Sequence, residues 1–172
     1  MILRQARITA IIMFAWLVFS PAYAPDLTGV PRIVDGDTLV IGSTKVRLQG
    51  IDAPETDQIC LNANGDDWTC GIEVRNEHVT HVAGREIRCS SNGIDAYQRT
   101  LGTCYLDDED LNAWMVQEGW ALAYVQYSKA YVHTEEDART QLRGLWQGAF
   151  IAPWDWRHRN NKTVILGMAS GS

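Results

Sequence analysis

The sequence lacks an excess of positive charge. Its 172 residues contain 15 Lys and Arg against 21 Asp and Glu, which gives a formal net charge of −6. Polyanions such as nucleic acids owe much of their affinity for proteins to Lys and Arg contacts, which release counterions. The charge balance therefore argues against a broad basic surface that holds a polyanion, and any cations for such a ligand must be local to one cleft.

A second long apolar run is also absent. The first run, Ile8–Phe19, follows Arg4 and Arg7 and precedes small residues that end at Ala24, which is the pattern of a secretory signal. Because the run is short for a bilayer, an uncleaved membrane anchor is the minority interpretation. Cleavage after Ala24 and cleavage after Ala22 both stay open. We expect a secreted or periplasmic protein.

Internal repeats and long linkers are absent as well. Once a signal peptide over residues 1–24 is set aside, about 150 residues remain, enough for one domain with a single core. We expect this domain to span residues 25–157. The polar end of the chain, residues 158–172, is expected to be disordered.

No two cysteines have zinc-finger spacing, which disfavours a structural zinc site. The chain has four cysteines, and an even number in an exported protein indicates two disulfides. Sequence alone allows three pairings. We favour Cys60–Cys70, which closes a loop rich in Asn, Gly and Asp, and Cys89–Cys104, which links two neighbouring predicted strands.

Apolar periodicity and turn residues predict the order of the elements. Two strands are expected between residues 32 and 51. The predicted helices cover 71–82, 111–118 and a segment that Thr134 caps and Gly144 ends, and the later strands cover 85–89, 100–106 and 120–125. Because strand residues 47, 49 and 51 share a face, a bend at 51–54 must redirect the chain for Asp52 to join Arg47.

The helix over 71–82 is expected to bury Ile72, Val79 and Val82. His78 and His81 lie three residues apart on it, but no acid or thiol has a matching spacing. We therefore interpret these histidines as part of a solvated face and not as metal ligands.

In the helix over 111–118, Asn112 lies among core residues, and we expect its amide to bond to loop backbone.

Acids and arginines gather around the first two predicted strands. Asp37 precedes the first strand, Arg47, Asp52 and Glu55 lie on or just after the second, and Arg99 follows later. A hairpin of the two strands would bring Asp37 near Asp52. These residue types suit hydrolysis of a charged phosphodiester, whose negative oxygens repel a nucleophile until cations neutralise them.

Oxygen donors in this segment favour a hard divalent ion. The carboxylates of Asp37 and Asp52 and the main-chain oxygen of Ala53 would hold calcium in preference to zinc or copper. So few protein ligands would leave room for water and phosphate.

Arg47 and Arg99 can each donate forked hydrogen bonds to phosphate oxygens, and Glu55 can orient or deprotonate the attacking water. Asp-Gly-Asp alone is a weak signal, because Asp-Gly also forms ordinary turns. The Asp-Gly-Asp motif is followed by Arg47 and Arg99 in a fixed order and spacing, and an ordinary hairpin turn does not explain that combination.

Three motifs carry a resemblance to a known family. They are Val-Asp-Gly-Asp-Thr at 34–38, Arg-Leu-Gln-Gly-Ile-Asp-Ala-Pro-Glu-Thr at 47–56 and Asp-Ala-Tyr-Gln-Arg at 95–99. The chain resembles the thermonuclease family, typified by staphylococcal nuclease, over about residues 32–146. The resemblance implies an α+β fold with a five-stranded OB-fold β-barrel and three helices, and calcium-dependent cleavage of DNA and RNA at the 5′ P–O bond.

The resemblance also implies roles for single residues. They are Asp37, Asp52 and the Ala53 carbonyl as calcium ligands, Arg47, Glu55 and Arg99 as the catalytic trio, Tyr97 as a ligand of the terminal phosphate, and Tyr124 and Tyr127 as nucleotide-stacking aromatics. Ala96 stands where the family usually has lysine, a departure that weakens the case for terminal phosphate binding.

The last apolar segment, 144–157, ends in Pro-Trp-Asp-Trp-Arg and resembles the closing segment of exported thermonuclease-like proteins. We expect its tryptophans to clamp the chain end onto the barrel.

Together these features predict a monomeric, exported, calcium-dependent nuclease that cleaves DNA and RNA with little sequence selectivity. Two alternatives remain. The barrel could be a catalytically silent nucleic-acid or protein-binding module, although such a module has no evident need for the retained acids and arginines. The chain could instead be an exported factor in envelope polysaccharide production, a label attached to some acidic thermonuclease-like chains, and the acidic balance slightly favours that interpretation.

Overall fold

A computed structural model describes residues 26–158 and 164–167, so the predicted signal peptide lies outside the described residues. The strands are β1 (Leu27–Gly29), β2 (Arg32–Ile33), β3 (Thr38–Ile41), β4 (Thr44–Leu48), β5 (Ile51–Asp52), β6 (Cys60–Leu61), β7 (Asp67–Trp68), β8 (Ile87–Ile94), β9 (Thr100–Leu106), β10 (Glu109–Asp110), β11 (Leu122–Ala123), β12 (Ala149–Ile151) and β13 (Ile165–Gly167). The helices are α1 (Cys70–Val82), α2 (Leu111–Gln117), α3 (Val132–Thr140) and α4 (Pro153–His158), with a 3-10 turn η1 (Gly144–Gln147). This mixed α+β content agrees with the sequence prediction.

The main sheet is open, but a short chain connection joins its two edges. Its strand order is β1-β8-β9-β4-β3-β2, and only Val30 and Pro31 separate the edge strands β1 and β2 in the sequence. Pro31 has no N–H to donate to a strand ladder. Among the described residues, strand pairing therefore gives a curled sheet and not the closed five-stranded barrel that the sequence predicts.

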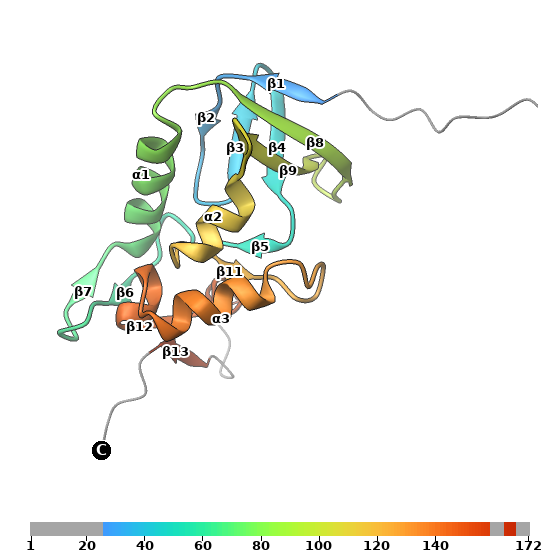
Figure 1. Ribbon diagram of the computed structural model, residues 1–172. Helices are drawn as coiled ribbons and strands as arrows, with labels where there is room; N and C mark the ends of the chain where they lie inside the picture. The colour runs from blue at the N-terminus through green and yellow to red at the C-terminus, as the bar shows by residue number, and fades with distance from the viewer. Residues whose placement is uncertain (1–25, 159–163, 168–172) are drawn as a thin grey trace, which may run out of the picture.

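Four α-helices occur in the described residues, where the sequence predicts three. The additional helix, α4, is the Pro-Trp-Asp-Trp-Arg segment, and proline is favoured at the first helical position because its missing N–H would be unpaired there anyway. Figure 1 shows α1 beside the sheet, with α3 crossing below β5 and β11.

Two apolar clusters hold the elements together. The larger lies among the main sheet, α1 and α2, and includes Leu39, Val46, Leu48, Val74 and Met115. The smaller includes Leu122, Ala138, Leu145, Trp146 and Phe150. Because Phe150 is part of β12, the smaller cluster fixes the strand from which α4 follows.

The buried face of α1 differs from the predicted one. It consists of Cys70, Gly71, Val74, His78 and Val82, while Ile72 and Val79 are exposed. The solvated face predicted for the histidines is wrong for His78, which is fully buried with its Nδ1 3.2 Å from the Gly36 carbonyl. A neutral imidazole can enter a core when its N–H has such an acceptor.

The predicted disulfides are confirmed. Cys60–Cys70 ties β6 to the first residue of α1, and Cys89–Cys104 joins directly paired residues of β8 and β9.

The end of the chain also differs from the prediction. Residues 165–167, within the segment expected to be disordered, form β13 and pair with β12. The third helix begins at Val132, so Thr134 lies inside it and is not its cap. The strand predicted over 120–125 is reduced to the two residues of β11.

Among residues 26–158 and 164–167, none of the helices has the length and hydropathy that a bilayer crossing requires.

Asn112 bonds to backbone in the core, as the sequence suggests. Its Oδ1 accepts from the Cys104 N–H at 3.1 Å, and its Nδ2 donates to the carbonyls of Gln49 and Gly102 at 3.0 and 3.1 Å. One fully buried amide thus links α2, β9 and the turn after β4.

Replacing Asn112 with Ala should lower the free energy of unfolding by about 3 kcal/mol, because three buried backbone groups lose a partner at about 1 kcal/mol or more each. Urea denaturation followed by circular dichroism measures the loss. Asn92→Ala is the matched control, because the exposed Asn92 amide donates to the Thr103 hydroxyl, and its effect should stay under about 0.5 kcal/mol. Equal losses in the two variants would contradict the linking role of Asn112.

Candidate active site

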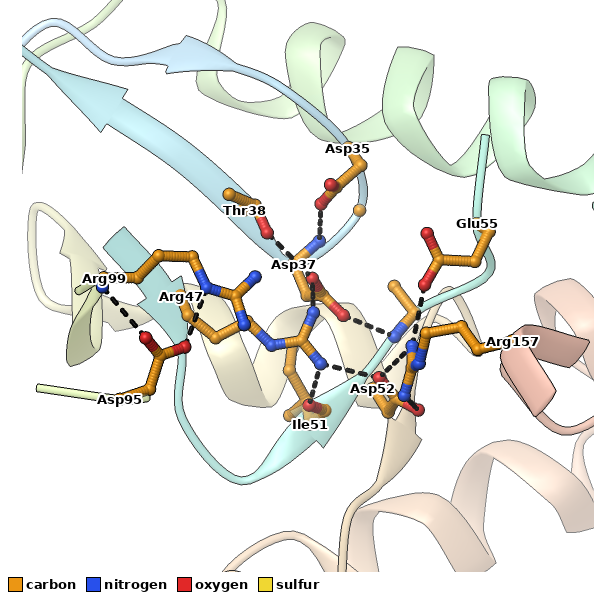
Figure 2. Close-up of polar contacts among 12 residues, drawn as sticks. Asp35, Asp37, Thr38, Arg47, Ile51, Asp52, Glu55, Asp95, Arg99 and Arg157 are labelled. Atoms are coloured by element: carbon orange, nitrogen blue, oxygen red, sulfur yellow. Dashed lines mark hydrogen bonds and ion pairs between the residues drawn. The ribbon is translucent and has the colours of Figure 1, made fainter. Parts of the chain in front are cut away.

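The β3–β4 hairpin sets Asp37 beside Arg47. Thr38 is the register partner of Arg47, and the Leu48 N–H donates to the Asp37 carbonyl at 2.8 Å. Because Val46 and Leu48 point into the core, alternation along the strand turns Arg47 to the opposite face. The carboxylate of Asp37 lies on that face, at the end of the hairpin (Figure 2).

A turn at Gly50 brings Asp52 to the same place. Gly50 has φ +79°, a conformation that side-chain-bearing residues rarely adopt, and it separates β4 from β5. The redirection predicted at 51–54 therefore occurs earlier, at the glycine. β5 then pairs with β11 and holds Asp52 opposite Leu122, fully buried.

Arg47 bridges the two buried carboxylates. Its Nη1 donates to Asp37 Oδ1, and its Nη2 donates to Asp52 Oδ1 at 2.6 Å. The other oxygen of Asp37 accepts from the Ala53 N–H at 2.8 Å. Figure 2 shows this guanidinium at the centre of the polar cluster. The structure thus brings together four of the residues that the sequence singles out.

Electrostatics at Arg47 reflect burial and crowding. Burial lowers the pKa of Arg47, Asp52 opposes this effect, and the positive charges of Arg99 and Arg157 lower the pKa further. Arginine remains charged under such shifts because its ordinary pKa is so high. Three guanidinium groups are therefore close enough to influence one another, and each is paired with nearby carboxylates.

Glu55 lies at the edge of this region on a tightly held loop. Its carbonyl accepts from the Gln58 N–H at 2.8 Å, and a Cβ at Gly71 would lie 1.7 Å from the same carbonyl oxygen. Only glycine fits at this first turn of α1, so the helix and the loop fix one another. The Glu55 side chain is about one-third exposed and accepts from Arg157 at 2.8 Å.

Arg157 is a site residue that the sequence analysis missed. It reaches from α4 to Asp52, 105 residues away, with Nη1 3.0 Å from Oδ1 and Nη2 2.7 Å from Oδ2. Burial alone would lower the pKa of Arg157, but hydrogen bonds and charge attraction from Asp52 and Glu55 outweigh it and raise the pKa. The available signal was its place at the end of the Pro-Trp-Asp-Trp-Arg motif.

Arg99 is held by the turn before β9. Asp95 accepts from the Arg99 and Tyr97 N–H groups, both at 2.9 Å, and from Arg99 Nε at 2.8 Å. Burial raises the pKa of Asp95, but these hydrogen bonds outweigh it and lower the pKa. Tyr97 is 81% exposed, and the Arg99 guanidinium carbon lies 5.5 Å from its ring centre.

The other two predicted substrate-binding tyrosines form a separate aromatic group. Tyr124 stacks on Trp154 of α4 with ring centres 5.5 Å apart, and Tyr127 meets Tyr124 edge-on at 4.9 Å. No ring contact in the described part of the chain joins this group to Tyr97. Trp154 therefore extends the set of aromatics near the site, and the sequence assigned it to packing.

Asp35 and His78 support the loop that carries Asp37. Asp35 Oδ1 accepts from the Asp37 N–H at 3.1 Å, and the His78 ring contacts the Gly36 carbonyl. Burial raises the pKa of Asp35, against the lowering effect of Thr38 and Arg47. Neither residue received a supporting role from the sequence.

The donor set suits a hard cation, since the carboxylates of Asp37 and Asp52 both lie against the guanidinium of Arg47 and supply oxygen donors. In the described residues no group of three or more His, Cys, Asp or Glu side chains gathers to hold a metal. A calcium ion would depend on main-chain oxygen, water or phosphate for its remaining positions. It would also have to share or replace arginine contacts.

Comparison with known proteins identifies the family. Residues 45–148 match the family model described as staphylococcal nuclease homologue. The chain belongs to the staphylococcal nuclease family. The matched range includes Arg47, Asp52, Glu55 and Arg99 but ends before α4, so Arg157 of this nuclease homologue lies outside it.

Three relatives of this nuclease homologue bear on its function. It is 33% identical over 166 residues to the micrococcal nuclease of Shigella flexneri, covering 86% of this chain and 90% of the relative. It is 32% identical over 167 residues to an uncharacterized endonuclease of Haemophilus influenzae, covering 92% and 88%. It is 34% identical over 127 residues to the succinoglycan biosynthesis protein ExoI of Rhizobium meliloti, covering 72% of this chain and 66% of that protein.

The free energy of unfolding should fall as pH is lowered from 6.5 toward 4. Burial lowers the pKa of His78 from 6.5 to about 4, so between these values the unfolded chain binds a proton that the folded protein does not. The contribution is fully present above pH 6.5, and about 3 kcal/mol of it is lost by pH 4.

Urea unfolding at pH 7 and pH 4.5 measures this loss. In His78→Gln the amide can still donate to the Gly36 carbonyl but does not titrate, so its stability should depend less on pH than that of the wild type. His133→Gln, at an exposed position of α3, is the matched control and should behave as wild type. An unchanged pH dependence in His78→Gln would contradict the assignment.

Proposed function

We propose that the protein is a nuclease, a phosphodiester hydrolase that requires calcium and cleaves DNA and RNA with little sequence selectivity. The convergence of Asp37 and Asp52 on Arg47, with Glu55 at the edge of the same site, carries the proposal. Membership of the staphylococcal nuclease family supports it, as do the relatives named endonuclease and micrococcal nuclease. The proposal includes an OB-type assignment for the curled main sheet.

In the proposed reaction, the two arginines bind the scissile phosphate. Arg47 and Arg99 donate to its non-bridging oxygens, and these hydrogen bonds strengthen as negative charge builds up in the transition state. Glu55 holds a water molecule and accepts its proton as the water oxygen attacks phosphorus in line. The opposite P–O bond, on the 5′ side, breaks, and the leaving oxygen takes a proton from solvent.

Asp37, Asp52 and the carbonyl of Ala53 would hold calcium, which supplies positive charge against the phosphate when it is bound. The exclusive use of oxygen donors supports calcium over softer metals.

Aromatic side chains near the site would bind the rest of the substrate. Tyr97 is exposed on the same turn as Arg99, and we assign it the role of binding the terminal phosphate of the substrate. Tyr124 and Tyr127 would stack on bases, each such contact contributing about 1–3 kcal/mol. Trp154, which stacks on Tyr124, supports an aromatic platform on this side of the site.

The two disulfides support an oxidising compartment, and we place the protein in the periplasm or outside the cell, acting as a monomer.

A second candidate function is supported by one relative. The chain resembles a protein named for succinoglycan biosynthesis, which favours an exported factor in envelope polysaccharide production. The third possibility, a binding module without turnover, explains the family membership but not the retained acids and arginines.

Substitution of the proposed catalytic groups should slow cleavage strongly without loss of fold. Glu55→Gln and Arg99→Ala should each slow degradation of plasmid DNA in calcium by roughly 100-fold or more, the scale for removing one group that stabilises the transition state. Agarose-gel and fluorescence assays of the oxidised protein measure the rate. Arg88→Ala removes an arginine from a surface ion pair with Asp26 and should cleave at the wild-type rate. A wild type that is folded but inactive would favour the two alternatives, the polysaccharide-production factor and the binding module.

Calcium removal should stop the reaction. Because the protein is acidic, it has little general attraction for polyanions and must depend on the bound cation to hold the phosphate. Cleavage of single-stranded DNA should fall steeply in EGTA and return when calcium is added in excess. Full activity in chelator would contradict the calcium requirement.

A further inference from the structure

Helix α4 delivers three side chains to the site from the far end of the chain. Arg157 contacts Asp52 and Glu55, Trp154 stacks on Tyr124, and the Trp156 indole N–H donates to Asp57 at 3.1 Å. The helix is therefore fastened beside the loop that carries Glu55.

Arg157 occupies the oxygen of Asp52 that Arg47 leaves open. Oδ1 of Asp52 accepts from both Arg47 and Arg157, whereas Oδ2 accepts from Arg157 at 2.7 Å. Asp52 is fully buried, and a buried carboxylate without a counter-charge costs several kcal/mol. Arg157, whose side chain is one-third exposed, thus supplies a second counter-charge to the buried Asp52 from the surface side of the pair.

The same guanidinium reaches the proposed base. Its Nη1 is shared between Asp52 Oδ1 and Glu55 Oε1, so one cation sets the distance between a metal ligand and the group that orients water. Figure 2 shows Arg157 lying between these two acids.

We propose that Arg157 is a positioning residue and a resident counter-ion: it holds Asp52 and Glu55 in the metal-free protein and must loosen its contacts with the Asp52 carboxylate when a divalent cation binds there. The inference rests on the proposed function in one respect, the assignment of Asp52 as a metal ligand. Calcium then competes with the Arg157 guanidinium for Asp52, so the free energy of displacing Arg157 weakens the measured affinity of the protein for calcium. The helix contacts of Trp154 and Trp156 keep the released guanidinium close to Glu55.

Isothermal titration of calcium into the full-length oxidised protein, without nucleic acid, tests this competition. Arg157→Gln should bind calcium about tenfold more tightly than wild type, the scale of one charge-assisted hydrogen bond. Arg157→Lys keeps the charge but loses the fork, and its affinity should lie between the two. Arg88→Gln removes one positive charge from β8 and should bind as wild type, which separates local displacement from a change in net charge.

Each outcome decides the matter. Tighter binding by Arg157→Gln, with the native near-ultraviolet circular dichroism spectrum and an unchanged Arg88→Gln, supports the inference. Equal or weaker binding by Arg157→Gln overturns the inference and leaves the nuclease assignment untouched. Calcium binding by none of the proteins overturns the inference together with the metal requirement. If Arg157→Gln does not fold, Arg157→Lys decides: affinity above wild type supports displacement, and affinity at or below wild type overturns it.

Discussion

The site depends on the need to neutralise two carboxylates in a protein interior. Asp37 and Asp52 are both almost fully buried, and each would be strongly destabilising without a counter-charge. Arg47 supplies that charge to both, so the hairpin, the Gly50 turn and β5 must all take positions from which their side chains reach one guanidinium. The geometry that we propose to bind phosphate is therefore also the geometry that neutralises the two buried carboxylates, with Arg157 as a second partner of Asp52.

Much of this arrangement could be predicted because its parts are close in the sequence. Asp37 and Arg47 belong to one hairpin, whose register follows from alternation and from the turn, and the motif order left few other interpretations. The disulfide pairs could be predicted for a related reason: Cys60–Cys70 closes a short polar loop and Cys89–Cys104 spans adjacent strands. Asn112 was expected to serve loop backbone, since a lone amide among core residues requires partners.

The residues that prediction missed act over long sequence separations. His78 meets Gly36, 42 residues away, and hydrophobicity alone assigned the inward face of α1 to Ile72 and Val79. A buried histidine becomes favourable only when a distant carbonyl accepts its N–H, and periodicity carries no information about that carbonyl. Arg157 was missed for the same reason. Its partners Asp52 and Glu55 lie 105 and 102 residues earlier in the sequence, and the acidic residue close to it in the sequence is Asp155. The closed barrel was expected from family resemblance, whereas the described strands leave β1 and β2 unpaired with each other at the two edges of the sheet.

The separation of 105 residues between Asp52 and Arg157 also governs when the site is completed during synthesis. A polypeptide that emerges amino terminus first exposes the β3–β4 hairpin long before its last helix exists. Contacts that close long loops carry a larger entropic cost and tend to form late. A nascent chain, or one clipped ahead of α4, therefore carries Asp37, Asp52 and Glu55 with one of their two arginine partners still missing.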